Sequence, residues 1–142
     1  MAEADPVIDW SVFSQARTEL GTGFIRILGY FREDGEKSIA KIEDAMRRQD
    51  AAGLVIPAHT LKSEARQFGA DPLGDLAEEI EFAARRGIEA RLFPDHLLTD
   101  VAKLRPLYEQ TIELFEQETN PLAQRRGGFG RGGPNNQDFG RL

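Results

Sequence analysis

Apolar residues recur at spacings of three and four along most of this chain, and the alternating pattern typical of strands is nearly absent. Such spacing places side chains on one face of an α-helix, which can then pack against a shared core. The pattern predicts one short helix and four longer ones. The residues expected to face the core are Trp10, Phe13, Ala16, Leu20, Phe24, Ile27, Leu28, Phe31, Ile39, Ile42, Ala45, Met46, Val55, Ala58, Leu61, Ala65, Phe68, Leu73, Leu76, Ala77, Ile80, Ala84, Leu97, Leu98, Val101, Leu104, Tyr108, Ile112 and Phe115.

Glycines and capping residues divide the first three helical segments. Asp9 is expected to cap the first helix, and residues 21–23 to interrupt the chain before the second. A further break is expected at residues 50–53. Gly69 is expected to end the third helix in a left-handed conformation.

Prolines mark the remaining boundaries. Asp71 and Pro72 are expected to begin the fourth helix as N-cap and first helical residue, and Gly87 to close it. Pro57 either marks the first turn of the third helix or kinks that helix. Pro106 should kink or split the last helix, which spans about residues 94–118.

Long amphipathic helices joined by short breaks predict an all-α fold, specifically an up-down antiparallel four-helix bundle with an additional short N-terminal helix across one end. A chain of 142 residues is the size of one domain. We expect an N-terminal extension over residues 1–8, the bundle over residues 9–119, and a disordered tail rich in glycine and arginine over residues 120–142.

Composition narrows the classes of function. The chain has no cysteine, which excludes disulfides and thiolate metal sites. Its N-terminus lacks the features of a signal peptide, and no apolar stretch approaches the ~20 residues that cross a bilayer, so we expect a cytoplasmic protein without membrane contact. The net charge is −6, of which the residues from 121 onward carry +3, leaving −9 on the rest. An acidic body argues against nucleic-acid binding as a general function of the folded part.

One histidine leaves the apolar stripe of its helix. His59 shares another face with Lys62, Ser63 and Arg66, at offsets of three, four and seven residues. A neutral imidazole is a good nitrogen nucleophile near pH 7, and a lysine one turn away can contact phosphoryl oxygens. The small Ser63 leaves room for a bulky partner. No glycine-rich nucleotide cradle lies nearby, so the phosphoryl donor should be another protein.

This stretch resembles the signature of histidine-containing phosphotransfer (HPt) domains. It reads Ala58-His59-Thr60-Leu61-Lys62-Ser63-Glu64-Ala65, followed by Phe68-Gly69-Ala70 and Leu73. The resemblance implies a four-helix bundle without catalysis of its own, which relays phosphoryl groups between receiver-domain aspartates in two-component phosphorelays. It implies His59 as the phosphoacceptor, with response-regulator receiver domains and a hybrid histidine kinase as partners. We expect no cofactor here, because Mg²⁺ in that chemistry belongs to the receiver.

The resemblance extends to the fourth helix and to a docking patch. In the family, an acceptor on that helix often binds Nδ1 of the histidine and leaves Nε2 as the nucleophile. The matching position is Glu81, and a basic residue found one turn later in some members matches Arg85. Ser63 stands where the family most often has glycine. The residues expected to dock receivers are Ile56, Ser63, Arg66 and Phe82.

Other functions stay open at this point. The chain could be a helical interaction module that binds or inhibits a receiver or kinase without being phosphorylated. Its tail, with Arg125, Arg126, Phe129 and Arg131, looks like a short RGG-type segment that could bind RNA. A hydrolytic enzyme has little support, because no nucleophile–base pair or metal-ligand spacing is present. A monomer is expected, since no spare apolar face is evident.

Overall fold

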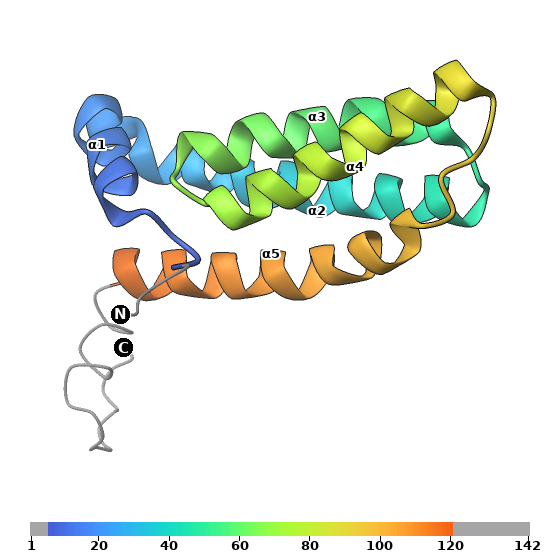
Figure 1. Cartoon of the computed structure of the whole chain (residues 1–142). Coiled ribbons are helices and arrows are strands. Elements are labelled where there is room, and N and C mark those ends of the chain that lie inside the picture. The colour runs from blue at the N-terminus through green and yellow to red at the C-terminus, as the bar shows by residue number, and fades with distance from the viewer. Residues whose placement is uncertain (1–5, 121–142) are drawn as a thin grey trace, which may run out of the picture.

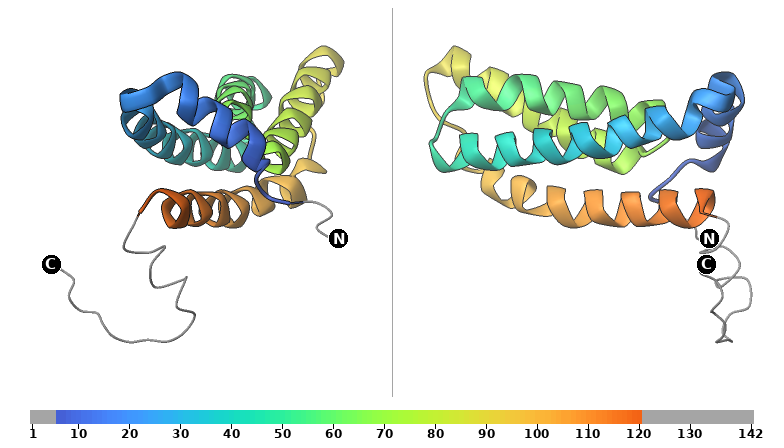
Figure 2. Two further views of the ribbon diagram at one scale, coloured as in Figure 1. Left: turned by 90° about the vertical axis from the view of Figure 1, so that its left-hand side faces the viewer. Right: turned by 180° about the vertical axis from the view of Figure 1, so that it is seen from behind.

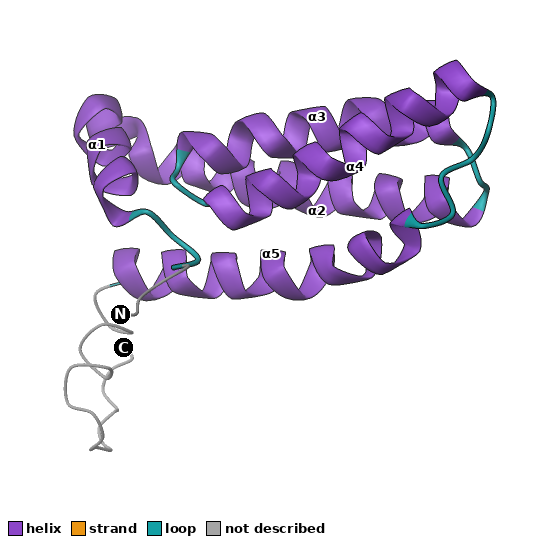
Figure 3. Cartoon of the chain, viewed as in Figure 1, coloured by secondary structure: helices purple, strands orange, loops and turns teal. Residues whose placement is uncertain are grey.

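The computed structural model describes residues 6–120; residues 1–5 and 121–142, which include nearly all of the expected tail, lie outside the described part. The described residues form helices and short connections (Figure 3). The helices are α1 (Trp10–Leu20), a 3₁₀ turn (Gly21–Gly23), α2 (Phe24–Arg47), α3 (Ala51–Gln67), α4 (Asp71–Ala90) and α5 (Leu97–Thr119). None of these helices is long and apolar enough to cross a membrane.

Helices α2 to α5 run up and down beside one another, and each is antiparallel to the next (Figure 1). The most extensive contact joins α3 and α4, which are connected by a turn of only three residues, Phe68 to Ala70. Short connections force consecutive helices to pack as neighbours. The predicted all-α, up-down four-helix bundle is confirmed.

Helix α1 lies across one end of the bundle (Figure 2). Asp9 caps it, accepting hydrogen bonds from the backbone N–H groups of Ser11 and Val12. The backbone N–H of Asp9 also donates to the carbonyl of Gly69, at 2.8 Å, which ties α1 to the α3–α4 turn. Gly69 has φ +82°, and a Cβ there would overlap the Asp9 carbonyl, so both the conformation and the close approach require glycine.

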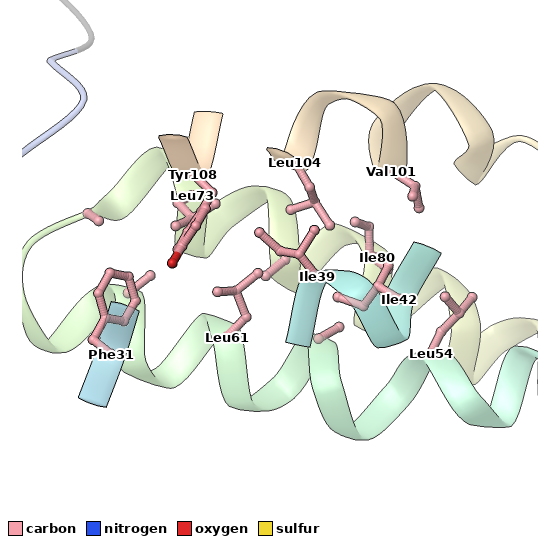
Figure 4. Close-up of a cluster of buried hydrophobic side chains, with 14 of the residues drawn as sticks. Phe31, Ile39, Ile42, Leu54, Leu61, Leu73, Ile80, Val101, Leu104 and Tyr108 are labelled. Carbon is pink, nitrogen blue, oxygen red and sulfur yellow. The ribbon is translucent and has the colours of Figure 1, made fainter. Parts of the chain in front are cut away.

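Buried apolar side chains from all of the described α-helices form one core, part of which Figure 4 shows. At the end that α1 covers it is aromatic: Phe13 of α1 stacks on Phe115 of α5 with ring centroids 5.0 Å apart, and meets Phe24 edge to face. Ile8, placed by the sequence in the N-terminal extension, is only 1% exposed and belongs to this core. The short helix therefore closes the core as well as crossing its end.

Some expected core residues do not lie in the core. Trp10 is 39% exposed at the start of α1, and Leu98 is 64% exposed because it follows the fully buried Leu97 and therefore lies on another face of α5. The others that are only partly buried pack at its edge: Leu20, Ile27, Leu28, Leu76 and Ile112.

Two helix starts differ from the predictions by a few residues. Helix α3 begins at Ala51, and Gly53 lies inside it, because Asp50 caps the helix by accepting from the Gly53 N–H. Helix α4 begins at Asp71, and its N-cap is Ala70 without a side-chain cap. Asp71 as N-cap is therefore wrong by one position, although an acid in the first turn still favours the helix dipole.

Gly87 does not close α4. The helix continues to Ala90 and ends at Arg91, which has φ +55°. A Cβ on Gly87 would lie 2.7 Å from the carbonyl oxygen of Leu92 and 2.9 Å from Cδ of Pro94. The glycine therefore lets the α4–α5 connection pass close to the helix, and does not terminate it.

Neither proline breaks its helix. Pro57 lies in the second turn of α3, not the first, and α3 continues to Gln67. Pro106 lies inside α5, which is not split. Pro106 has no N–H group to donate to the carbonyl of Ala102, four residues earlier. Both residues are exposed, so water can bind that carbonyl.

Gly35 of α2 lies directly against Tyr108 of α5. A Cβ on Gly35 would lie 2.6 Å from Cε1 of Tyr108, a ring that is 4% exposed and whose hydroxyl donates to the carbonyl of Arg32. A buried ring that is also hydrogen-bonded cannot easily move aside for an added methyl group.

We expect Gly35→Ala to lower the free energy of unfolding by about 1–2 kcal/mol, because overpacking outweighs the gain in helix propensity. Gly29→Ala, in the same helix, meets nothing within 4 Å, and should raise that free energy by up to about 1 kcal/mol. Urea denaturation of both variants measures the difference; equal stabilities would contradict the close approach.

Two carboxyl groups meet between α2 and α3. Glu64 of α3 shares a hydrogen bond with Asp34 of α2, and Oε1 of Glu64 is buried without a partner. Burial, followed by the charge of Asp34, raises the pKa of Glu64 to about 7. The protonated carboxyl therefore stabilises the fold at low pH, and this contribution is lost as the pH rises through 7.

We expect the free energy of unfolding of Glu64→Gln to fall less between pH 5 and pH 8 than that of the wild type, by about 1 kcal/mol after allowance for partial exposure. Denaturation curves at the two pH values measure this. Glu33→Gln, an exposed acid of α2, is the control and should keep the wild-type dependence. An unchanged dependence in Glu64→Gln would disprove the shared proton.

Candidate functional site

His59 lies on the outer surface of α3, near the middle of the helix. Its neighbours Ala58 and Leu61 are fully buried, which fixes the rotation of the helix about its axis. The His59 side chain is left 52% exposed. The predicted departure of His59 from the apolar stripe is confirmed.

Glu81 of α4 contacts the imidazole ring of His59. It is 2% exposed, and its Oε2 is 3.1 Å from Nδ1 of His59. An ionised carboxylate only accepts hydrogen bonds, so the proton of a neutral ring belongs on Nδ1. The other nitrogen, Nε2, then keeps its lone pair for chemistry.

Two cationic side chains also bind the carboxylate of Glu81. Nζ of Lys62 is 2.9 Å from Oε1 of Glu81, while Nε and NH2 of Arg85 donate to Oε2 at 3.0 and 2.9 Å. Burial acts to raise the pKa of Glu81, but the hydrogen bonds from its three partners outweigh it and hold that pKa below its ordinary value of 4.5. Glu81 is therefore ionised at neutral pH.

Lys62 is more enclosed than a lysine on an open helix face. Its side chain is 15% exposed, and Nζ lies 5.4 Å from the centre of the Phe82 ring. The contacts of Lys62 with Glu81 and Phe82 were not predicted from the sequence. One feature of the sequence could have indicated these contacts. His59 and Lys62 share one face of α3, and the residues they contact, Glu81 and Phe82, are consecutive on α4.

The expected docking residues divide into two groups. Ile56 is 69% exposed, Phe82 is 43% exposed, and Ser63 is also exposed, so these three border the histidine as an open surface. Arg66 instead forms two ion pairs: its NH2 atom lies 2.8 Å from Oδ1 of Asp75 and 2.7 Å from Oε1 of Glu78.

Gly74 allows Arg66 to reach these acids. A Cβ on Gly74 would lie 2.8 Å from Cγ of Arg66, so the arginine stem lies directly on the backbone of α4. Asp75, Glu78 and Gly74 were missed by sequence reasoning, because a partner on another helix leaves no periodic signal in the sequence. Arg66 joins α3 to α4 one turn beyond Lys62.

The site has no metal-binding constellation. Within residues 6–120, no group of three or more histidine, aspartate or glutamate side chains is placed to hold an ion. What the arrangement offers is a half-exposed imidazole with one nitrogen bound by a buried carboxylate and two cations beside it. Fold and site together define a helical-bundle protein with a half-exposed histidine on its surface that contacts a buried carboxylate.

Comparison with known proteins identifies the family. The sequence profile of the Hpt domain matches residues 26–119, well over half of the chain. The chain therefore belongs to the Hpt domain family, whose members are phosphocarriers of two-component signalling. No curated protein matches the chain in sequence.

The fold is similar to the crystal structure of histidine-containing phosphotransfer protein B from Pseudomonas aeruginosa PAO1. The TM-score is 0.71, the sequences are 24% identical, and the match covers 86% of this chain and 98% of that one. At this identity the likeness supports the bundle fold, including the place of the helices that carry the site.

Proposed function

We propose that this protein accepts a phosphoryl group on Nε2 of His59 and passes it to the aspartate of a receiver domain. The observation that carries the proposal is the contact between Nδ1 of His59 and the buried, ionised Glu81, at 3.1 Å. It supports Nε2 as the free nucleophile on a ring that is half exposed.

The two cations fit a phosphoryl group. Lys62 and Arg85 both pair with Glu81, the carboxylate that contacts Nδ1 of His59. A phosphoryl group on Nε2 would bring two negative charges within reach of both, and charge-assisted hydrogen bonds would steady it during transfer. We propose Lys62 as the nearer contact and Arg85 as the second. Catalysis and Mg²⁺ would come from the receiver.

The surface around His59 supports docking of a protein. Ile56, Ser63 and Phe82 present two apolar side chains and one small polar one beside the histidine, and exposed apolar patches of this kind suit a protein interface. We propose that receiver domains, including that of a hybrid histidine kinase, dock here. Arg66, which is bound to two acids, would contribute at the rim.

Replacing His59 tests the proposal. Wild-type protein mixed with a phosphorylated receiver and Mg²⁺ should gain acid-labile, alkali-stable phosphate. His59→Gln should gain none, and His96→Gln, at the other of the two histidines, should be labelled at the wild-type rate. Circular dichroism checks that both variants fold. Labelling of His59→Gln would refute the proposal, and receiver binding without any phosphohistidine in the wild type would favour the unphosphorylated interaction module.

Lys62→Met tests the role of the nearer cation. The variant keeps the aliphatic stem beside Phe82 but loses the charge, so transfer should slow by about ten- to a hundredfold, the worth of one charge-assisted hydrogen bond. The measurement is the rate of label transfer from a phosphorylated receiver. Lys103→Met, an exposed lysine of α5, is the control; equal rates for the two variants would exclude Lys62 from transfer.

A further inference from the structure

An open groove lies between α2 and α5, away from the histidine. It has a volume of about 600 Å³, and every residue that lines it belongs to one of these two helices. Tyr108 and Ile112 are its apolar lining residues. His59 and Glu81 lie on the other two helices of the bundle, α3 and α4. A ligand bound in this groove would therefore leave the candidate site open.

The charged residues of the groove are mostly acidic. Five acids and two cations line it, which gives a net charge of −3. Two of the acids are already paired, Glu116 with Arg32 and Glu36 with Arg105 at the edge of the groove. The remaining three are exposed and form no ion pair with any residue of the described part of the chain: Glu33, Glu109 and Glu113. Against them stands one cation of the lining that is likewise unpaired within residues 6–120, Lys37.

A segment of opposite charge follows α5 in the sequence. Residues 121–142 lie outside the described part and carry a net charge of +3, with arginines at 125, 126 and 131. A guanidinium group can bind a carboxylate through two parallel hydrogen bonds. Its aliphatic stem can at the same time cover apolar surface such as Ile112. The segment therefore matches the groove in charge and in the apolar surface that its arginines can cover.

The end of α5 brings this segment to the groove. The helix ends at Thr119, close to α1 (Figure 1). Glu113 and Glu109 lie six and ten residues earlier, about 9 and 15 Å back along the helix axis. The five residues that lead from Asn120 to Arg125 span up to about 17 Å when extended. A tether this short gives an effective concentration on the order of millimolar, which favours contacts that are weak one by one.

We propose that the arginine-rich segment 121–142 binds back into the groove between α2 and α5, with its arginines paired to Glu33, Glu109 and Glu113. This inference is independent of phosphoryl transfer. The segment then serves as a counter-charge for the acidic bundle and covers apolar surface between the two helices. Its arginines are withdrawn from nucleic acid, whose binding would need them free. The face of α3 and α4 that carries His59 remains available to a protein partner.

The test locates the segment with a spin label on the full chain. The protein has no cysteine, so Gly133→Cys introduces a single site for a nitroxide. Broadening of backbone amide signals in ¹⁵N–¹H spectra then reports which residues the label approaches. We expect residues 32–37 and 109–116 to be broadened much more strongly than residues 56–63. The effect should weaken when salt is raised from about 0.05 M to about 0.5 M, because exposed ion pairs are screened.

Matched charge variants test the pairing. Replacing Glu109→Gln together with Glu113→Gln should reduce the broadening of the groove about threefold or more, because two ion pairs are lost. Replacing Glu79→Gln together with Glu89→Gln removes the same charge from exposed positions of α4 and should leave the broadening unchanged. Circular dichroism checks that all variants fold. Equal broadening in the two double variants would overturn the proposal.

A charge exchange makes the assignment specific. Arg125→Glu with Arg126→Glu should abolish the broadening of the groove. Adding Glu109→Arg and Glu113→Arg to that variant should restore it, because the pairs are re-formed with their charges reversed. Failure to restore it would overturn the pairing of these arginines with these acids.

A mixed sample identifies where the segment binds. Spin-labelled chain without ¹⁵N is mixed with ¹⁵N-labelled chain that carries no spin label. The proposal expects no broadening of the groove in this mixture. Broadening there would show that the segment binds a second copy, and broadening centred on residues 56–63 in the singly labelled chain would show that it covers the histidine face. Either result would contradict binding within one chain at the α2–α5 groove.

Discussion

The contact between Nδ1 of His59 and the buried carboxylate of Glu81 is the interaction on which the site depends. A carboxylate with 2% exposure is costly to bury unless it is paired; His59 and Arg85 bind its Oε2, and the Lys62 ammonium lies 2.9 Å from its Oε1. The same bonds fix the ring and hold two cations beside it. The buried charge thus gives an exposed imidazole a defined orientation and a positive surrounding.

That contact requires α3 and α4 to keep a fixed register. The three-residue turn after Gln67 sets how the two helices slide against each other. Gly69 lets the chain before α1 pack on this turn, and Gly74 lets Arg66 lie across α4. At the covered end, Phe13 closes the aromatic core. Gly69 and Gly74 are therefore sites of close approach that hold the register of α3 and α4.

The sequence predicts the helices and the face of His59 well, because both follow from the 3.6-residue period. It could not show that Glu81 reaches His59, since that distance depends on the packing of two helices. The partner of Lys62 and the acids that bind Arg66 were missed for the same reason. The predicted helix boundaries at Gly53 and Gly87 were wrong. Glycine can either end a helix or allow another segment to pack closely against it, and only the tertiary neighbours show which of these roles it has.

We propose that Glu81 occupies Nδ1 of His59 and leaves Nε2 to carry the phosphoryl group. The most direct measurement is the position of the phosphate after transfer from a phosphorylated receiver, read from ring ¹⁵N–¹H correlation spectra of the labelled protein. We expect a single phosphohistidine, the Nε2 isomer, on His59. The Nδ1 isomer, or phosphate on His96 alone, would contradict it.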